Sequence, residues 1–326
     1  MRDESQDICI DAVIPWVDGN DEDWQQKINK YLEVKIDFDK KKESVRFNSI
    51  GEIDIAIRSI IKFAPYFRNI FLVTDNQKPE SFDTLRTLAK SKGINLLLID
   101  HKIIFEGFEE YLPCFSSCSI ETMFIKIPNL SEHFVIFNDD FFLMRETKPT
   151  DFFIDGYPII RGRWKKFNED KKIRKFYHNV LSFVGKPKIK KGVSFKGIQQ
   201  KGARLAGTDK YVRHFHAPYS VRKSVLVDYF KKNDLVDNIK YRFRDKNQFV
   251  VYSLADHLEI KNNTCHFKRN TKLTYFRTYK NIIKVKLKLF WFSKNKNKIF
   301  ITCQSLEMAD DKTQKYLLKW FDKRLN

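Results

Sequence analysis

The sequence has 326 residues, of which 42% are hydrophobic and 15% aromatic, and it carries a formal net charge of +20 at pH 7. This apolar content excludes a disordered chain and is sufficient for one large domain or two smaller ones with a substantial core. No stretch reaches the roughly 18 uncharged apolar residues that a membrane-spanning helix requires.

The N-terminus and the cysteines indicate the compartment. The first residues, MRDESQDICIDAV, carry acids where a secretory signal has Lys or Arg before an apolar run. The five cysteines are odd in number and widely spaced, as is typical of free thiols in a reducing compartment. We therefore expect a cytoplasmic protein, with peripheral binding to the inner face of the plasma membrane as an open alternative.

The positive charge is concentrated in two segments. Residues 161–204 hold 15 Lys and Arg against 2 acids, and residues 261–298 hold 12 Lys and Arg against none. Residues 1–160 are acidic, with 19 basic and 28 acidic residues. An acidic domain has the wrong sign to bind a phosphate backbone directly, but it can hold a divalent cation that meets a phosphate.

Strands and helices alternate over the first 140 residues. Apolar runs predict strands at 9–16, 69–74, 94–99 and 133–137. Helical spacing and capping signals predict helices at 21–34, 52–63, 79–92 and 119–127. This order is typical of an α/β fold with a largely parallel sheet that is buried on both faces.

The pattern changes in the second half of the chain. Short strand-like pieces lie between Lys-rich loops up to about residue 204, and residues 218–260 read as helices that could close over the sheet edge. In residues 283–292, IKVKLKLFWF, Lys alternates with apolar residues, which predicts a strand with one cationic face. Such a face is a solvated sheet edge, or a surface for a membrane or an anionic acceptor.

Aspartates follow all four predicted strands of the first half. They are Asp18, Asp75, Asp100 and the pair Asp139-Asp140. Parallel strands bring their carboxyl ends to one edge of the sheet, so these acids would converge there. A single Asp after a strand is also ordinary turn chemistry. The adjacent pair differs, because it continues into FFLM without Gly or Pro, and repelling charges beside apolar residues require a cation.

Four blocks of the sequence resemble the signatures of the Stealth proteins. They are, in chain order, VIPWVDGNDEDW (13–24), residues 46–79, residues 112–143 with LPCFSSCSIE and FNDDFFL, and HFHAPYSVRK (214–223) with RFRDKNQF (242–249). This family includes bacterial capsule polymerases and the enzyme that starts the lysosomal mannose-6-phosphate tag. The resemblance extends over residues 8–260.

The resemblance implies a sugar-1-phosphate transferase. Such an enzyme moves hexose-1-phosphate from a UDP-sugar to an acceptor sugar hydroxyl, forms a phosphodiester and releases UMP, here in capsule or cell-surface polysaccharide synthesis. It implies a glycosyltransferase type A-like, Rossmann-like α/β core with a mostly parallel sheet, plus a basic α+β cap and acceptor region. The implied partners are the UDP-sugar and an oligosaccharide, polysaccharide or phosphoglycan acceptor, with no nucleic acid.

These expectations divide the chain into three segments. Residues 1–160 are expected to form the core that binds the nucleotide sugar and the metal. Residues 161–260 are a Lys-rich insertion and a helical segment that complete the active site. Residues 261–326 are a basic C-terminal region that packs on the core.

The candidate catalytic residues follow from the needs of phosphoryl transfer, which are charge neutralisation and in-line placement of the reacting oxygens. Asp139 and Asp140, joined by Asp18, offer hard oxygen ligands to Mg²⁺ or Mn²⁺. His216 is the candidate general base, since an imidazole titrates near pH ~6.5 and the resemblance favours this residue. His214 would share a strand face with it, so a metal-binding pair or a structural histidine are rival interpretations.

The remaining candidates bind the substrates. Arg244 is the expected cation for the charge that develops on the phosphoryl group, with Arg242 as the alternative. The resemblance adds a set of substrate contacts, namely Arg46, Glu52, Arg58, Asp75, Arg242 and Gln248. For Arg58, inside a predicted helix, an ion pair with Glu52 or Asp54 is an equal alternative.

Two other functions compete with this interpretation. A conventional glycosyltransferase would attack the anomeric carbon of the same donor and release UDP. A nucleic-acid-binding protein would use the two cationic segments, where Phe and Tyr are scattered among Lys, as in HFKRNTKLTYFRTYK.

Overall fold

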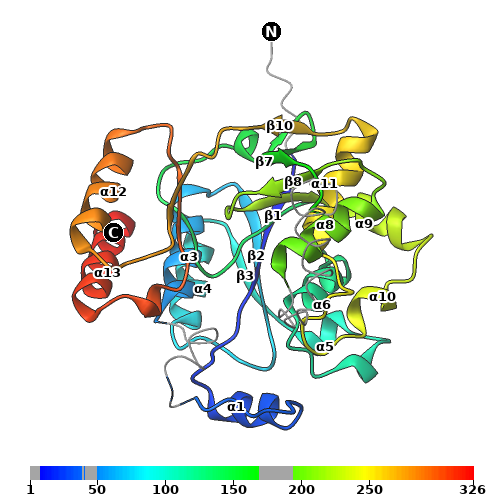
Figure 1. Ribbon diagram of the computed structural model, residues 1–326. Coiled ribbons are helices and arrows are strands. Elements are labelled where there is room, and N and C mark those ends of the chain that lie inside the picture. The colour runs from blue at the N-terminus through cyan, green and yellow to red at the C-terminus, as the bar shows by residue number, and fades with distance from the viewer. Residues whose placement is uncertain (1–7, 39, 41–49, 169–193) are drawn as a thin grey trace, which may run out of the picture.

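The computed structural model describes residues 8–38, 40, 50–168 and 194–326, and its centre is a five-stranded sheet (Figure 1). The strand order is β3-β2-β1-β4-β9. The bounds of these strands are β1 Ile10–Pro15, β2 Phe67–Thr74, β3 Asn95–Asp100, β4 His133–Ile136 and β9 Tyr219–Arg222. The first four are parallel and β9 runs antiparallel to β4. The expected α/β class with a mostly parallel sheet is confirmed.

Helices cover both faces of this sheet. In Figure 1, α3 and α4 lie on one side of it, and α6, α8 and α11 lie on the other. In the described residues up to Asn262, the helices are α1 Glu22–Asn29, α3 Glu52–Phe63, α4 Phe82–Ser91, α5 His101–Ile104, α6 Ser117–Thr122, α8 Phe195–Leu205, α9 Lys223–Phe230, α10 Val236–Ile239 and α11 Val251–Asn262. Four short 3₁₀ turns accompany them, at Glu109–Tyr111, Met123–Lys126, Pro149–Asp151 and Leu306–Met308. Because each sheet face is covered, β1 can be apolar almost throughout.

One charged residue lies inside the sheet. Asp11, the second residue of β1, is fully buried, and the guanidinium of Arg68 of β2 donates to both of its carboxylate oxygens at 3.1 and 2.7 Å. The backbone N–H groups of Asn69 and Ser131 donate to the same carboxylate at 3.2 and 2.7 Å. The charge is tolerated because every bond that it needs is made, and these bonds join β1, β2 and the start of β4.

Two smaller sheets flank the central one. The first has the order β10-β7-β6 with β8 also paired to β7, and the second has the order β11-β12-β5. Their strands are β5 Phe141–Leu143, β6 Phe153–Ile154, β7 Tyr157–Lys165, β8 Tyr211–His214, β10 His266–Lys268, β11 Leu273–Phe276 and β12 Phe300–Cys303. The chain passes from β4 through the Asp139-Asp140 turn into β5, so this turn joins the central sheet to the C-terminal strands.

Two expectations about the second half are wrong. Residues 283–292 do not form a strand, because they lie within helix α12, Ile282–Lys294. The local alternation of Lys with apolar residues concealed a second pattern, in which Val285, Leu289 and Phe292 recur at helical spacing and are buried. Asn281 caps the helix by accepting the N–H of Ile283 at 2.9 Å. Residues 219–222, expected to begin a helix, form β9 instead.

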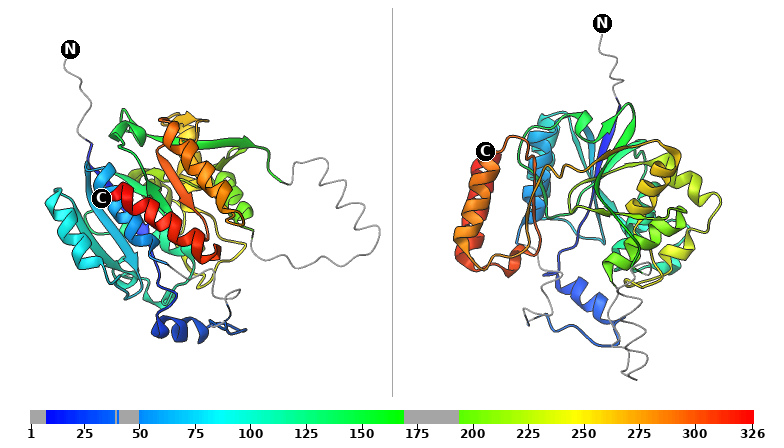
Figure 2. Two further views of the ribbon diagram at one scale, coloured as in Figure 1. Left: turned by 90° about the vertical axis from the view of Figure 1, so that its left-hand side faces the viewer. Right: turned by 45° about the horizontal axis from the view of Figure 1, so that its top comes forward.

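The C-terminal part of the chain packs on the same core. Helix α13, Asp311–Leu325, lies beside α12 on the outer flank of the molecule (Figure 2). A continuous cluster of buried apolar side chains reaches from Ile10 of β1 to Leu325 of α13. The described parts of the three segments drawn from the sequence therefore share one core. No helix among the described residues has the length and apolar content needed to cross a membrane.

Candidate active site

The acids predicted from the sequence lie at one edge of the central sheet. The strands β1, β2, β3 and β4 are parallel, so their carboxyl ends all face the side on which α1 lies (Figure 1). Asp18, Asp75 and Asp100 follow or end the first three strands, and Asp139-Asp140 follow the fourth. The strand order therefore brings these aspartates to one edge of the sheet, as expected. Their side-chain contacts divide them into two groups.

The first group stabilises turns. Asp18 accepts the N–H of Asn20 at 2.9 Å, and its backbone is held by the side-chain amide of Gln77. Asp75 forms an ion pair with Lys27 of α1 at 3.0 Å. Asp100 accepts the backbone N–H groups of Asn76 and Lys102 at 2.7 and 2.8 Å. These are the turn contacts that a single aspartate after a strand typically makes.

The second group centres on Asp140 and His216. Nε2 of His216 lies 3.1 Å from Oδ2 of Asp140, and the two side chains are 28% and 14% exposed. The other oxygen, Oδ1 of Asp140, is buried and has no hydrogen-bond partner among the described residues. One carboxylate thus orients an imidazole and still has a coordination position to fill.

The C-terminal strands hold this pair in place. The N–H of Cys303 donates to the carbonyl of Asp140 at 3.2 Å, and Oγ1 of Thr302 donates to the carbonyl of His216 at 2.8 Å. The rings of Phe141 and Tyr275 meet the imidazole edge-on, with centroids 4.7 and 5.8 Å away. The ring orientation is therefore set by packing on two sides.

Asp139 and Glu52 add two more carboxylates. Burial, together with the negative charges of Asp140 and Glu52, raises the pKa of Asp139 to about 8. Glu52 lies in the first turn of α3, where it is 5% exposed and accepts the N–H of Ile50 at 2.6 Å. Acids that repel one another in a buried place favour a divalent cation.

The donor set fits a hard metal ion. The carboxylates of Asp139 and Asp140 are oxygen donors, and the unpartnered oxygen of Asp140 is a position that a cation would satisfy. In the described part of the chain, no group of three or more His, Cys, Asp or Glu side chains is arranged to hold a metal ion by itself. Mg²⁺ suits such a place, because it usually takes one or two carboxylates and fills its shell with water and substrate phosphates.

Arg244 lies beside a different carboxylate. Its guanidinium donates to Oγ of Ser117 at 2.9 Å, and its Nε is buried without a hydrogen-bond partner in the described residues. Burial raises the pKa of Glu121 to about 7, and the positive charge of Arg244 opposes that rise. Burial raises the pKa of Tyr219, and the negative charges of Glu121 and Asp140 raise it as well.

Several predicted substrate contacts have structural roles instead. Gln248 is fully buried and makes four hydrogen bonds, with Ser116, Ser119, Asn238 and Asp245. An amide with all its bonds satisfied inside the protein cannot bind a ligand without breaking them, so Gln248 makes structural contacts in this conformation.

The two other arginines are also engaged within the protein. Arg58 pairs with Asp322 at 2.8 Å and with Asp54 at 3.5 Å, on the face of α3 that α13 covers, so its structural alternative describes the contact found. Arg242 donates to the carbonyls of Pro113 and Leu112, and its guanidinium lies 4.2 Å from the Tyr31 ring centre. Arg46 lies outside the described residues.

His214 does not form a metal pair with His216. Its Nε2 lies 2.6 Å from Asp256 and its Nδ1 lies 3.0 Å from the amide of Gln199. Both ring nitrogens are in use, and burial lowers the pKa of this histidine to about 3. His214 is therefore a structural histidine, which was one of the rival interpretations.

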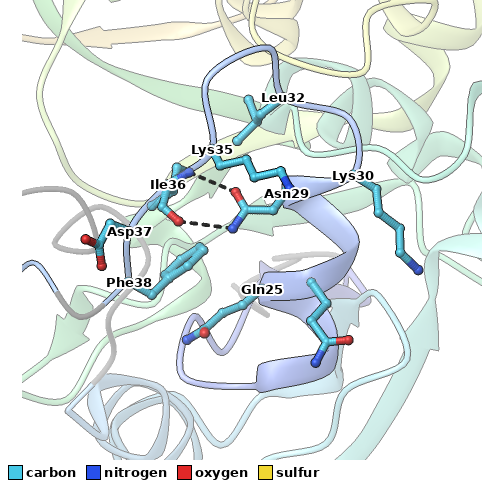
Figure 3. A pocket seen from close by; sticks show the side chains of 9 residues that line it. Gln25, Asn29, Lys30, Leu32, Lys35, Ile36, Asp37 and Phe38 are labelled. Carbon is cyan, nitrogen blue, oxygen red and sulfur yellow. Dashed lines mark hydrogen bonds between the residues drawn. The ribbon is translucent and has the colours of Figure 1, made fainter.

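A separate hollow lies on the outer side of α1. It has a volume of about 660 Å³ and is lined by one face of α1 and the loop that follows, up to Phe38 (Figure 3). The side chain of Asn29 ties this loop to the helix through two hydrogen bonds to the backbone of Ile36, at 3.0 and 2.8 Å. None of the predicted site residues lines this hollow.

Comparisons with known proteins decide the family. Residues 10–33 match Stealth protein CR1, conserved region 1, and residues 46–158 match Stealth protein CR2, conserved region 2. The chain is 35% identical over 232 residues to the receptor polysaccharide phosphotransferase WefC of Streptococcus gordonii, and the alignment covers 67% of each chain. The chain belongs to the Stealth family.

Other Stealth relatives align over shorter parts of their length. The chain is 39% identical to the capsular polysaccharide phosphotransferase cps1A of Actinobacillus pleuropneumoniae, over 47% of this chain and 40% of that protein. It is 30% identical to the capsular polysaccharide phosphotransferase fcs1 of Haemophilus influenzae, over 76% of this chain and 65% of that protein. The chain thus spans about 40% of the length of cps1A.

Solved structures with a similar arrangement have little sequence identity to this Stealth chain. One is the galactosyltransferase LgtC in complex with donor and acceptor sugar analogs, with a TM-score of 0.47 and 10% identity over 97% of this chain and 95% of that chain. Another is the apo form of the glycosyltransferase GlyE of Streptococcus pneumoniae, with a TM-score of 0.43 and 10% identity over 98% of this chain and 62% of that chain.

The matched Stealth regions contain part of the site, and the sequence interpretation missed another part. Asp18, Glu52, Asp139 and Asp140 lie inside the matched regions, whereas His216 lies beyond them. Glu121 was not singled out, although it ends the LPCFSSCSIE block. Its place on α6, about one turn after Ser117 at the helix start, was not enough to reveal its burial near the charge of Arg244.

Proposed function

We propose that this protein transfers a sugar-1-phosphate from a UDP-sugar to a hydroxyl group of a saccharide acceptor. The acceptor oxygen forms a bond with the β-phosphorus of the donor, the bond from that phosphorus to the bridging oxygen breaks, and UMP leaves. A phosphodiester remains between the two sugars. Stealth membership and relatives named polysaccharide phosphotransferases support this reaction class.

The observation that carries the proposal is that the two oxygens of the Asp140 carboxylate differ: Oδ2 is bonded to His216, and Oδ1 is buried without a partner among the described residues. Its Oδ2 accepts a hydrogen bond from Nε2–H of His216, which leaves Nδ1 of the imidazole as a proton acceptor. Within the described residues Nδ1 has no partner, so it is available to take the proton of the acceptor hydroxyl. The negative charge of Asp140 then stabilises the imidazolium that forms.

Asp139 and Asp140 would hold a Mg²⁺ or Mn²⁺ ion through their carboxylate oxygens, of which Oδ1 of Asp140 is buried without a partner among the described residues. When bound, the ion would neutralise charge on the donor diphosphate. The protein's own contribution is to keep two carboxylates close together in a buried turn, at an energetic cost that the raised pKa of Asp139 reflects.

Arg244 would bind the developing negative charge of the phosphoryl group. Its buried Nε lacks a partner in the described part of the chain, and a phosphate oxygen would satisfy it. Glu121 keeps this guanidinium in position through charge. Arg242 is the weaker candidate, because its guanidinium is already bound to two carbonyls and stacked near Tyr31.

The nucleotide product tests the proposal. The protein is incubated with a panel of UDP-sugars, Mg²⁺ and a saccharide acceptor, and the released nucleotide is identified by mass. UMP together with a phosphodiester-linked sugar supports the transfer of sugar-1-phosphate. UDP with a glycosidic product would show a conventional glycosyltransferase instead.

A further inference from the structure

Helix α12 exposes an unusual number of large apolar side chains. Ile283, Leu287, Phe290 and Trp291 are 63%, 52%, 51% and 65% exposed. They are four of the thirteen large hydrophobic side chains exposed on the described residues, and they lie within three helical turns. A single exposed apolar residue is ordinary, but such a concentration on one helix indicates a binding surface.

These four residues form one stripe along the outer side of α12. At about 100° per residue, positions 283, 287, 290 and 291 fall on one side of the helix. Val285, Leu289 and Phe292 fall on the opposite side and are buried, with the Phe292 ring 5.9 Å from Trp320 of α13. Figure 2 shows α12 and α13 on the outer flank, so the stripe faces away from the core.

Lysines border the stripe on both sides. The same helical geometry places Lys286 along one border of the stripe and Lys284 and Lys288 along the other. Lys294 lies at the C-terminal end of the helix, within 5.7 Å of the Phe290 ring centre. No acid occurs anywhere from residue 261 to residue 298, so nothing in this stretch offsets the positive charge.

We propose that α12 docks in the interfacial region of an anionic lipid bilayer. An apolar stripe with Trp and Phe suits the boundary between headgroups and acyl chains, and bordering lysines suit acidic headgroups. The stripe and its lysine borders together define the docking surface, which consists of residues 283–294. Both the apolar and the electrostatic parts of the interaction come from one helix.

Charge argues against a second copy of the chain as the occupant. A twofold contact would place the stripe of one molecule on that of another and would bring the lysine borders together without any acid between them. A soluble polyanion would meet the lysines but would leave the four apolar side chains in water. A bilayer surface satisfies both features of the helix.

The docking surface is connected to the candidate active site. Nζ of Lys288 donates to the carbonyl of Tyr275 at 3.0 Å, and the ring of Tyr275 packs on His216. Helix α12 and the site thus both contact Tyr275 of β11. Docking would therefore hold the site at a fixed height above the bilayer, whatever the reaction is.

Vesicle binding by the full chain tests the proposal. The wild type and the variant Phe290→Ser/Trp291→Ser are sedimented with vesicles of phosphatidylcholine alone or with 30 mol% phosphatidylglycerol. We expect the wild type to bind the anionic vesicles at least tenfold more tightly than the neutral ones, and the variant to lose at least tenfold. The control Leu88→Ser/Ile103→Ser removes two residues of 40% and 43% exposure elsewhere and should bind like the wild type.

Other outcomes would overturn the proposal. Equal binding by the wild type and the stripe variant would remove α12 from the interaction, as would wild-type binding to soluble heparin but not to vesicles. Loss of a dimer in light scattering, with vesicle binding unchanged, would identify a second copy as the occupant. Circular dichroism checks that the variant folds, and Ile283→Gln provides a second change in the stripe with the same expected loss.

Discussion

His216 and Asp140 lie 76 residues apart in the chain and are joined by a hydrogen bond of 3.1 Å. The histidine follows β8 and the aspartate follows β4, so two different sheets supply the pair. The side-chain hydroxyl of Thr302 and the backbone N–H of Cys303 then donate to the carbonyls of His216 and Asp140, which ties both residues to strand β12 of a third sheet. The pair forms only when all three sheets are assembled.

Replacing His216 by Ala should lower turnover by roughly 10²–10⁴, which is the usual contribution of a general base, and should change donor affinity only a few-fold. UMP release measured against donor concentration separates the two effects. His266→Ala, on β10, is the matched control and should behave like the wild type. Unchanged turnover in His216→Ala would remove this histidine from the mechanism.

Replacing Asp140 by Asn should abolish metal-stimulated activity, because the amide keeps the shape of the carboxylate and loses its charge. Rates are measured with Mg²⁺ and in chelator, with Asp100→Asn as the control from the turn-stabilising group. A wild type that is fully active in chelator would contradict the assignment of Asp139 and Asp140 as ligands.

Glu121→Gln should stabilise the folded protein at high pH. Burial raises the pKa of Glu121 from 4.5 to about 7, so between these values the folded state binds a proton that the unfolded chain does not. Wild-type stability therefore falls as pH rises through this window. The advantage of the variant should be absent below pH 4.5 and grow to the order of 3 kcal/mol above pH 7.

Chemical unfolding at pH 4.5, 6 and 8 checks this prediction, with Glu109→Gln on the surface as control, because its carboxylate is exposed. A constant difference between variant and wild type at all three values would show that the proton is not taken up on folding. Activity should fall in Glu121→Gln if the carboxylate positions Arg244, so stability and activity would change in opposite directions.

Asp11→Ala should destabilise the protein by roughly 3 kcal/mol, because the backbone donors of Asn69 and Ser131 would lose their buried acceptor. Denaturant unfolding measures the change. Asp83→Ala removes an exposed aspartate that pairs with Lys78, and it should cost less than about 1 kcal/mol. Similar effects of the two substitutions would show that the buried bonds contribute little.

Gln248→Ala should reduce stability by about 1–3 kcal/mol and leave the KM for the donor unchanged. The reason is that the amide joins the loop before α11 to α6 and α10 and is closed to solvent. Thermal unfolding and initial rates at a temperature where the variant is folded provide the two readouts. A large rise in KM with normal stability would restore the predicted substrate contact.

The first half of the fold was accessible from the sequence because its signals are local. Pro65 and Gly93 end helices where expected, and apolar runs mark β1 to β4. The second half depends on long-range packing. Whether Tyr219–Arg222 forms a helix or a strand is decided by β4 beside it, and α12 was missed because a short period-two pattern overlies a helical one.

The site residues show the same division between features that local sequence predicts and features that depend on long-range packing. The position of the acids at one sheet edge follows from the strand order, so Asp139 and Asp140 could be selected from the sequence. Which hydrogen bonds each polar group makes does not follow, because Gln248 and Arg58 find their partners on segments distant in sequence. Glu121 was missed for the same reason, because its raised pKa comes from burial on α6, which packs against α10 and α11 from the second half of the chain.

The pairing of β12 with β5 makes the site depend on residues far beyond the conserved regions. A chain that ends at residue 298 would lack β12, whose residues hydrogen-bond the backbone carbonyls of Asp140 and His216. Such a chain would still contain the candidate site residues Asp139, Asp140 and His216. Under the proposed function, a fragment that keeps Asp140 and His216 in place must therefore include β12.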